Sequence, residues 1–454
     1  MKVALAPTLP TPNSDKTWSL VFWIIQRQDL SADILSVHKT EISKALEQAL
    51  NEEKGRQAKL DALKVRAFPL LTGCDLPNFV KAIHNLLKSH PWLVISLFSR
   101  LFPLVLTHLI SDDADCRFQA AYALCGFALA KLRVSSAFPH QLVVATLDKF
   151  VQDQTSKQKF TQGELYLPVT IQAAFASHDI KQCCWACVVL ASVIVLSDAS
   201  IFSHPHSLKL CISSLESAVA HMYSSIRALH VHVWKAIVWA FSRLPVPLVG
   251  TSLDFGDLEG KQNIRGNAFL VAKQELKGGI GISLVAALLG PGTVKPDPIE
   301  TSDDVSRALI VVEDLMAGKR HSNPHDGLLL LRRLLGAIGT SDIDTIPIWS
   351  DNVHPTSGLL DGTILDARTS DLKSVISDLH EADVAAVRPL SEGEVAHHWV
   401  PLMSLWILYA QIELRGFAPE FSVRIHRVGM IIFKYACSRS WCTSGNHSFL
   451  LEQI

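Results

Sequence analysis

Apolar residues recur along most of the chain at intervals of three and four. Between residues 116 and 132 they trace one broad helical face: Phe118, Ala121, Tyr122, Cys125, Ala128, Leu129 and Leu132. Six more repeat the interval further on: Ile226, Leu229, Val233, Ile237, Phe241 and Leu244. No run alternates apolar and polar residues as a half-buried strand does, and no Asn-Gly or Asp-Gly turn is flanked by strand-like segments. The pattern predicts an all-α protein.

The helical period predicts a long series of helices. Several begin at a Ser or Asp followed by an acidic residue, a combination that caps the free N–H groups of a first turn; Ser391 with Glu394 is one case. The predicted helices span residues 33–53, 58–71, 76–88, 91–110, 114–133, 139–152, 164–176, 179–197, 205–223, 225–243, 264–289, 302–317, 324–338, 369–387, 393–414 and 417–440.

Helices of this length joined by short links are typical of an α-solenoid of the HEAT/armadillo type, in which antiparallel helix pairs stack on one another. The alternative is a compact multi-helix globule. Breaks in the series suggest a division into a flexible N-terminal tail, a first helical-repeat block, a connecting loop, a second block, an acidic loop and a C-terminal helical block with a frayed tail. These parts cover residues 1–17, 18–245, 246–263, 264–339, 340–368 and 369–454.

Two strongly apolar runs raise the question of a membrane span. Gln182–Ser197 carries no charge and is bracketed by Lys181 and Asp198, and Trp399–Ile412 is shorter still. Both fall short of the roughly 20 apolar residues that a bilayer requires. We therefore expect two buried helices of a helical core and no membrane partner. The N-terminal residues also lack the apolar stretch of a signal peptide.

Composition excludes two broad classes of protein. Hydrophobic residues make up 48% of the 454 residues, which excludes a disordered chain, and a net charge of −1 excludes a globally basic nucleic-acid binder. Charge is nevertheless uneven. Residues 342–394 carry eleven acids and three bases, whereas residues 415–439 carry five bases and one acid. A second basic set lies near the N-terminus, at Lys54, Arg56, Lys59, Lys64 and Arg66.

Nine cysteines, an odd number without regular spacing, indicate a reducing compartment rather than a disulfide framework. Cys183, Cys184 and Cys187 contain a C-x-x-C pair inside an apolar helix, but no second pair follows at zinc-finger spacing. We interpret them as core residues. Cys437, Cys442 and His447 match no zinc module either, so no metal is expected.

Other candidate chemistry is weak. Lys277-Gly278-Gly279-Ile280-Gly281 lacks the spacing and the preceding strand of a phosphate loop, and is interpreted as a helix break with a second helix from Ile282. His397-His398 and His230-x-His232 point to different helix faces, which disfavours chelation. No serine-hydrolase elbow, metalloprotease helix, kinase loop or EF-hand occurs. We therefore expect no catalytic residues, no cofactor and no enzyme activity.

Three segments carry a resemblance to a known family: residues 117–128 (RFQAAYALCGFA), residues 233–241 (VWKAIVWAF) and residues 271–281 (VAKQELKGGIG). In this order, with the Leu9-Pro10-Thr11-Pro12 start, they resemble the N-terminal helical-repeat domain of fungal Rif-type telomere-associated proteins, the Rap-interacting factors. The resemblance covers roughly residues 40 to 340.

The resemblance implies a curved HEAT/armadillo array in the nucleus, at telomeres and other chromosomal sites, with DNA and chromatin proteins as partners and DNA held by basic helix faces. The candidate DNA-binding residues are Arg424, Arg427, Lys434, Lys54, Lys59 and Arg66. The family also recruits a type-1 phosphatase through short motifs. None is found here, because residues 64–68 (KVRAF) place the Phe one residue too late.

Two other function classes remain open. One is a general HEAT/armadillo scaffold in transport or complex assembly, which would act in the cytoplasm. The other is a helical enzyme. A basic concave surface would favour the DNA scaffold, an apolar or acidic groove the protein scaffold, and a deep pocket with convergent polar groups the enzyme.

Overall fold

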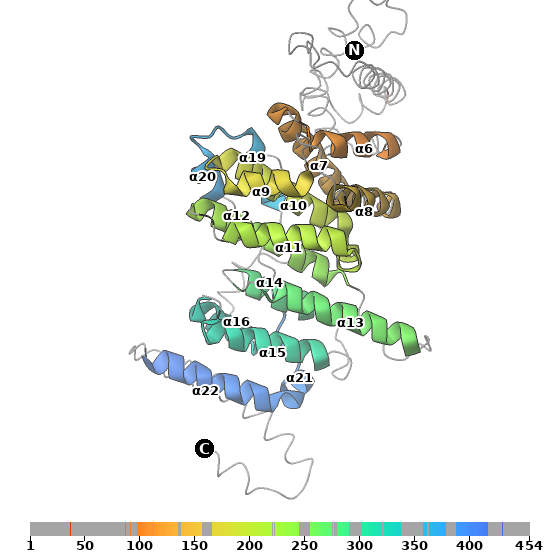
Figure 1. Ribbon diagram of the computed structural model, residues 1–454. Coiled ribbons are helices and arrows are strands. Elements are labelled where there is room, and N and C mark those ends of the chain that lie inside the picture. The colour runs from red at the N-terminus through yellow and green to blue at the C-terminus, as the bar shows by residue number, and fades with distance from the viewer. Residues whose placement is uncertain are drawn as a thin grey trace, which may run out of the picture. The chain divides into compact units, whose positions relative to one another are not determined.

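The computed structural model describes the middle and much of the later part of the chain. The described residues are 98–111, 113–134, 138–156, 166–244 without 220 and 222, 255–274, 276, 279–289, 302–319, 322–336, 357–360, 363–377 and 387–415, with the single residues 37, 87, 91 and 429. Within these ranges all regular structure is helical and no strand occurs, so the all-α prediction is confirmed (Figure 1).

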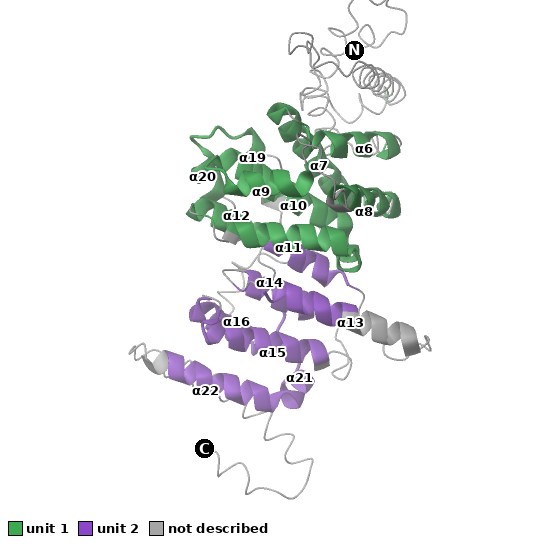
Figure 2. Ribbon diagram, in the orientation of Figure 1, with its two compact units in different colours: residues 1–233, 356–379 green, residues 234–355, 380–454 purple. Residues whose placement is uncertain are grey.

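The chain divides into two compact units (Figure 2). Unit 1 comprises Met1–Val233 and Thr356–Leu379, and unit 2 comprises Trp234–Pro355 and His380–Ile454. The chain therefore leaves unit 1 after residue 233, returns to it for residues 356–379 and then completes unit 2.

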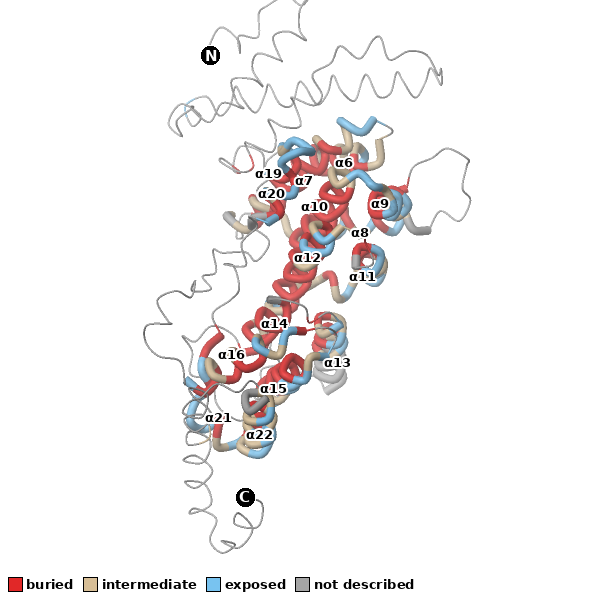
Figure 3. The backbone as a smooth tube through the Cα atoms, turned by 90° about the vertical axis from the view of Figure 1, so that its left-hand side faces the viewer, coloured by how far each residue is buried: buried red, intermediate tan, exposed pale blue. Residues whose placement is uncertain are grey.

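Unit 1 is built around one enclosed helix. Its elements are α6 (Phe98–His108), α7 (Ala114–Arg133), α8 (His140–Ser156), α9 (Leu167–Ala176), α10 (Ile180–Ser197), η2 (Asp198–Ser203), α11 (Pro205–Val219), the first half of α12 (Ser224–Ser242), α18 (Ser357–Leu360), α19 (Thr363–Asp366) and α20 (Leu372–Ser377). Helix α10 packs against α7, α8, α9, α11, α18 and α19, and every residue from Cys183 to Ser197 is buried (Figure 3). Among the described helices, the segment Ile180–Ser203 alone is long and apolar enough to cross a membrane, and 78% of its most apolar window is buried inside the protein. The prediction of a buried helix here is confirmed.

Polar contacts fix both ends of α10. At its start, the Asp179 carboxylate accepts a hydrogen bond from the Lys181 N–H at 2.9 Å. At its end, the Lys131 ammonium of α7 donates to the carbonyls of Val195 and Leu196, at 2.9 and 3.1 Å, and lies 3.1 Å from the Asp198 carboxylate. A buried cation thereby satisfies carbonyls that the helix leaves free at its C-terminus.

Unit 2 arranges its helices in two layers. It contains the second half of α12, then α13 (Phe255–Ala272), α14 (Gly279–Leu289), α15 (Ser302–Met316), α16 (Pro324–Leu334), α21 (Glu392–His397) and α22 (Trp399–Arg415). Helices α13, α15 and α22 lie in one layer and α14 and α16 in the other (Figure 1, Figure 3). Helix α15 packs against α14, α16 and α22, so it is the centre of this unit.

Ion pairs and a small residue join the helices of unit 2. The Arg265 guanidinium of α13 lies 2.9 Å from the Asp304 carboxylate of α15, and the Lys273 ammonium lies 2.7 Å from that of Asp314. Gly327 of α16 approaches the end of α15 so closely that an added Cβ would lie 2.7 Å from the Met316 nitrogen. Only glycine permits this approach without displacing the backbone.

Most predicted helices in the described ranges are found, with several differences. The prediction for residues 114–133 matches α7, and the capping box at Ser391 and Glu394 is present. Helix α13 begins at Phe255, inside the expected connecting loop, and α14 begins at Gly279 rather than Ile282. Residues 357–360 and 363–366, expected in the acidic loop, form α18 and α19 because their leucines and isoleucine are buried.

The predicted core is largely confirmed. The two apolar faces that the period predicts point into the core, since six of their large residues are buried: Phe118, Tyr122, Cys125, Val233, Ile237 and Phe241. Leu129 of the first face is covered less completely and has intermediate exposure. In α7 every residue from Ala120 to Ala128 is buried, which shows that this helix is enclosed on more than the single face that the period predicts.

Candidate functional site

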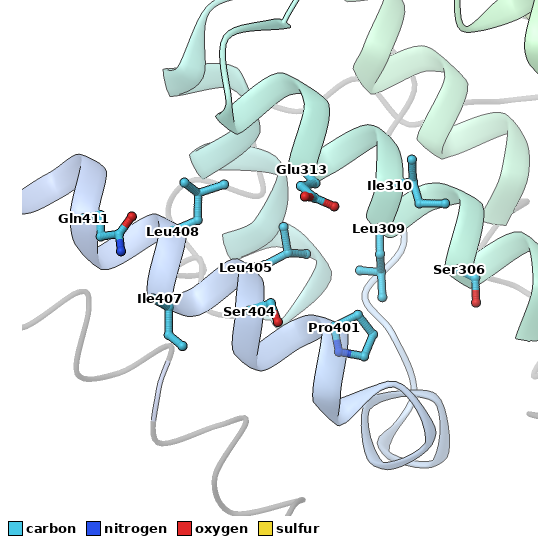
Figure 4. Close-up of a pocket in the computed structure, with 10 residues that line it drawn as sticks. All are labelled: Ser306, Leu309, Ile310, Glu313, Pro401, Ser404, Leu405, Ile407, Leu408 and Gln411. Atoms are coloured by element: carbon cyan, nitrogen blue, oxygen red, sulfur yellow. The ribbon is translucent and has the colours of Figure 1, made fainter. Parts of the chain in front are cut away.

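A groove runs between α15 and α22 on unit 2 (Figure 4). Its volume is about 510 Å³. The two helices run in the same direction, since the lining residues of both follow one another from right to left in Figure 4, from Ser306 to Glu313 and from Pro401 to Gln411. The groove is lined by Ser306, Leu309, Ile310, Glu313, Pro401, Ser404, Leu405, Ile407, Leu408 and Gln411.

Helical spacing places these side chains on the groove. Ser306, Leu309, Ile310 and Glu313 follow one another at intervals of three, one and three, which is one face of α15. Leu309 and Leu405 are buried beneath the groove, while Ile310 and Ile407 are 42% and 47% exposed. Pro401 lies in the first turn of α22, where the missing N–H removes no helical hydrogen bond.

Polar groups are few in the groove and do not converge. The Ser404 hydroxyl donates to the Val400 carbonyl at 3.3 Å and is thus engaged within its own helix. Of the described residues that line the groove, Glu313 alone is ionisable, and it is exposed. Among the described lining residues, no base, nucleophile and oxyanion donor meet around one point, and this lining suits apolar binding better than acid–base catalysis.

A buried ion pair fixes the segment that leads into α22. The Arg388 guanidinium makes two hydrogen bonds to the Glu394 carboxylate, at 2.7 and 2.9 Å, and its Nε donates to the Leu289 carbonyl at the end of α14 at 2.9 Å. The Leu390 N–H also donates to the Leu334 carbonyl of α16 at 2.8 Å. These contacts hold α21 against both neighbouring helices, and α22 begins two residues after α21 ends.

The pKa of Glu394 reflects this environment. Burial by itself raises the pKa of the carboxyl group, but the hydrogen bonds from Arg388 and the Ser391 N–H, with the charge of Arg388, outweigh it and lower the pKa to about 2. Glu394 is therefore ionised and paired, and it contributes little to the acidic surface that the sequence suggested for residues 342–394.

Exposed apolar side chains mark the groove further. In the described part of unit 2, four large hydrophobic residues are exposed: Leu270, Ile310, Val400 and Ile407. Two of these line the groove, and Val400 lies one residue before Pro401. The expectation that Trp399–Ile412 is a buried helix was therefore wrong, because α22 buries only one side, with Leu402, Leu405 and Tyr409.

The DNA-binding residues predicted from the sequence lie outside the described residues. This applies to Arg424, Arg427, Lys434, Lys54, Lys59 and Arg66, and also to Cys437, Cys442 and His447. The groove residues were not singled out from the sequence. The signal that could have found them is in α22, whose first fourteen residues carry no charge on any side of the helix.

The cysteines of α10 are core residues, as predicted. Cys183, Cys184 and Cys187 are buried, and burial raises the pKa of Cys183 to about 11 and that of Cys184 to about 12. The Cys183 sulfur lies 3.8 Å from Nε2 of His221, but its thiol donates to the Ala174 carbonyl at 3.2 Å. A protonated, buried thiol is not the thiolate that a Cys–His nucleophile requires. In the described part of the chain, no three His, Cys, Asp or Glu side chains gather as a metal site would require.

The glycine-rich segment is a helix break, as predicted, since α13 ends at Ala272 and α14 begins at Gly279. Gly281 lies within α14, where an added Cβ would approach Leu315 to 2.8 Å. This glycine therefore serves close helix packing.

No model of a known protein family matches the chain, and a search of the curated proteins finds no match.

Proposed function

We propose that this chain is a non-enzymatic helical scaffold that binds another protein through the groove between α15 and α22. The observation that carries the proposal is that Ile310 of α15 and Ile407 of α22 both line the groove and remain 42% and 47% exposed, while Leu309 and Leu405 beside them are buried. Exposed apolar side chains around a groove are typical of a protein-binding surface.

An α-solenoid is the architecture that we propose for the chain. In unit 2, the two-layer arrangement and the parallel course of α15 and α22 support it, because equivalent helices of successive repeats run in the same direction. Grooves between such helices provide extended surfaces for partners.

The proposal is tested by comparing the proteins that co-purify with the wild-type chain, the Ile407→Asp variant and the Leu270→Asp variant. Both variants place a charge at an exposed residue of unit 2, but Leu270 does not line the groove. A partner that binds the groove is lost with Ile407→Asp, retained with Leu270→Asp, and binds the wild-type chain directly when purified. If no partner distinguishes the two variants, the groove is not a binding site.

A Rif-type scaffold on telomeric DNA in the nucleus is a more specific form of this proposal. It is supported by the sequence resemblance and by the basic residues near both ends of the chain, while the described residues offer an apolar groove. Salt-dependent binding of duplex DNA tests it, because each phosphate contact releases counterions. Arg424→Glu with Arg427→Glu should then weaken binding to all sequences alike and flatten the salt dependence. If the wild-type chain shows no salt-sensitive binding of DNA, only the protein-scaffold proposal remains.

A further inference from the structure

We infer that the α15–α22 groove receives a basic amphipathic helix of a partner protein, with apolar side chains in the groove and a Lys or Arg side chain at Glu313. The inference rests on the proposed protein-binding function and specifies the chemistry of the partner. It follows from the shape of the groove, its charge and the position of Gly429.

The shape of the groove favours a helix. Its lining on α22 extends from Pro401 to Gln411, about 15 Å at 1.5 Å per residue, which is the length of about three helical turns. Both walls are helices, whose backbone groups are paired within the helix, so the groove has no sheet edge to which an extended peptide could add. A helical ligand satisfies its own backbone and can place residues i, i+3 or i+4 and i+7 in the groove.

The charge of the groove favours a basic partner. Glu313 is exposed at the last lining position of α15, and in Figure 4 it lies nearer to Leu405 than to Gln411. The bases near Glu313 are directed to other carboxylates. Arg307 lies 3.0 Å from the Asp304 carboxylate and over the ring of Phe269 of α13. Lys319, whose charge also acts on Glu313, lies 2.7 Å from the Asp314 carboxylate. The described lining therefore presents one negative charge and no positive charge.

Gly429, the one residue after α22 that the structure describes, lies away from the groove. An added Cβ on Gly429 would lie 2.8 Å from the ring of Trp406, so this residue packs directly on that side chain. Trp406 is two residues from both Ser404 and Leu408, a rotation of about 200° along a helix, and thus faces away from the groove. Gly429 therefore lies on the side of α22 opposite to the groove.

The test measures binding of two model peptides to the full chain by fluorescence anisotropy. Each peptide is long enough for three helical turns and has leucines at i, i+3, i+4 and i+7, so that it can form the helix on binding. One carries lysines along the flank of this stripe and the other carries glutamates at the same positions. We expect the lysine peptide to bind about two- to fivefold more tightly at low ionic strength, which is the range for an exposed charge pair, and the preference to shrink in high salt.

Charge reversal identifies the residue responsible. Glu313→Lys should invert the preference, so that the glutamate peptide binds more tightly. Glu216→Lys is the matched control, because Glu216 is an exposed acid on α11 of unit 1. It should leave the preference unchanged, and circular dichroism should show both variants folded.

The outcomes separate this inference from the function on which it rests. If both peptides bind equally and Ile407→Asp abolishes both, the groove binds helices but the basic partner is wrong. If neither peptide binds, or Ile407→Asp changes neither, both proposals fall. If the wild-type chain is a dimer in solution that Ile407→Asp converts to a monomer, a second copy fills the groove and the inferred partner is wrong.

Discussion

Arg388 and Glu394 form a buried two-pronged ion pair, with 2.7 Å between Nη2 and Oε1 and 2.9 Å between Nη1 and Oε2. The Glu394 side chain also accepts a hydrogen bond from the Ser391 N–H at 2.8 Å, and its own N–H donates to the Ser391 hydroxyl. One carboxylate thus completes the capping box of α21 and neutralises the arginine that binds the end of α14. This ion pair fixes the segment that precedes α22. Helix α22 forms one wall of the groove.

Loss of the Arg388–Glu394 ion pair should lower the free energy of unfolding. Glu394→Gln leaves the Arg388 charge buried without a counter-charge, and breaking a buried pair in this way costs about 3–5 kcal/mol. The measurement is the free energy of unfolding in urea for the variant and the wild type. An equal free energy would show that the pair contributes nothing to stability.

The same pair predicts a pH dependence. The pKa of Glu394 is lowered from its ordinary 4.5 to about 2, so the unfolded chain binds its proton first as the pH falls. The stabilisation is fully present above pH 4.5 and is lost as the pH falls from 4.5 towards 2. The difference in unfolding free energy between wild type and Glu394→Gln should shrink across this window. A difference that is constant with pH would contradict the assignment.

Two glycine substitutions should have opposite effects on stability. Gly327→Ala places a Cβ 2.7 Å from the Met316 nitrogen, which the backbone of α15 cannot easily avoid, and should destabilise the protein by about 1–3 kcal/mol. Gly266→Ala in α13 meets no atom within 4 Å and should stabilise it by about 0.5–1 kcal/mol, because alanine favours the helix. Thermal unfolding of both variants checks the pair, and a Gly327→Ala variant as stable as the wild type would show that the α15–α16 approach is not as close as described.

Phe241 is fully buried in α12, with the Arg265 guanidinium 5.1 Å from its ring centroid. Phe241→Ala removes this packing and should lower the free energy of unfolding by about 3–5 kcal/mol. Leu142→Ala is the control, since Leu142 is exposed on α8 and its loss should change stability by less than about 0.5 kcal/mol. Equal effects of the two substitutions would mean that the face of α12 is assigned wrongly.

The buried thiols should be slow to react. Burial raises the pKa of Cys184 and of Cys211 to about 12, so neither forms a thiolate at neutral pH. Alkylation of the native chain with iodoacetamide, followed by mass spectrometry of the peptides, should leave both unmodified until denaturant is added. Rapid alkylation of Cys184 in the folded chain, or stoichiometric zinc that is lost with Cys184→Ser, would overturn its assignment as a core residue.

The sequence predicts the enclosed helices better than the partly covered ones. The apolar run Gln182–Ser197 and the apolar side of α22 look alike in sequence, but α10 is surrounded by six other helices whereas α22 packs mainly against α15, α16 and α21. Burial therefore depends on how many neighbours an element finds, which its own periodicity does not record. For the same reason Ile407 could not be recognised as exposed.

Contacts between distant segments could not be predicted from the sequence either. The Asp, Pro and Gly residues of 340–368 predict a connection, yet Leu359, Leu360, Ile364 and Leu365 are buried because α18 packs against α7 and α10 and α19 against α10. In the sequence, Arg388 and Glu394 belong to an acidic segment, and only the structure shows that both are buried and form a pair. The capping box at Ser391, by contrast, is local and was predicted correctly.

The central claim is that the α15–α22 groove binds a helix, and titration of the lysine peptide against three forms of the full chain tests it most directly. Burial of an apolar side chain such as Ile407 contributes about 1.5–3 kcal/mol, so Ile407→Asp should weaken binding by about tenfold or more. Leu270→Asp, which places the same charge at an exposed residue outside the groove lining, should bind as the wild type does. Equal affinity of Ile407→Asp and the wild type, or no saturable binding by the wild type, would contradict the account.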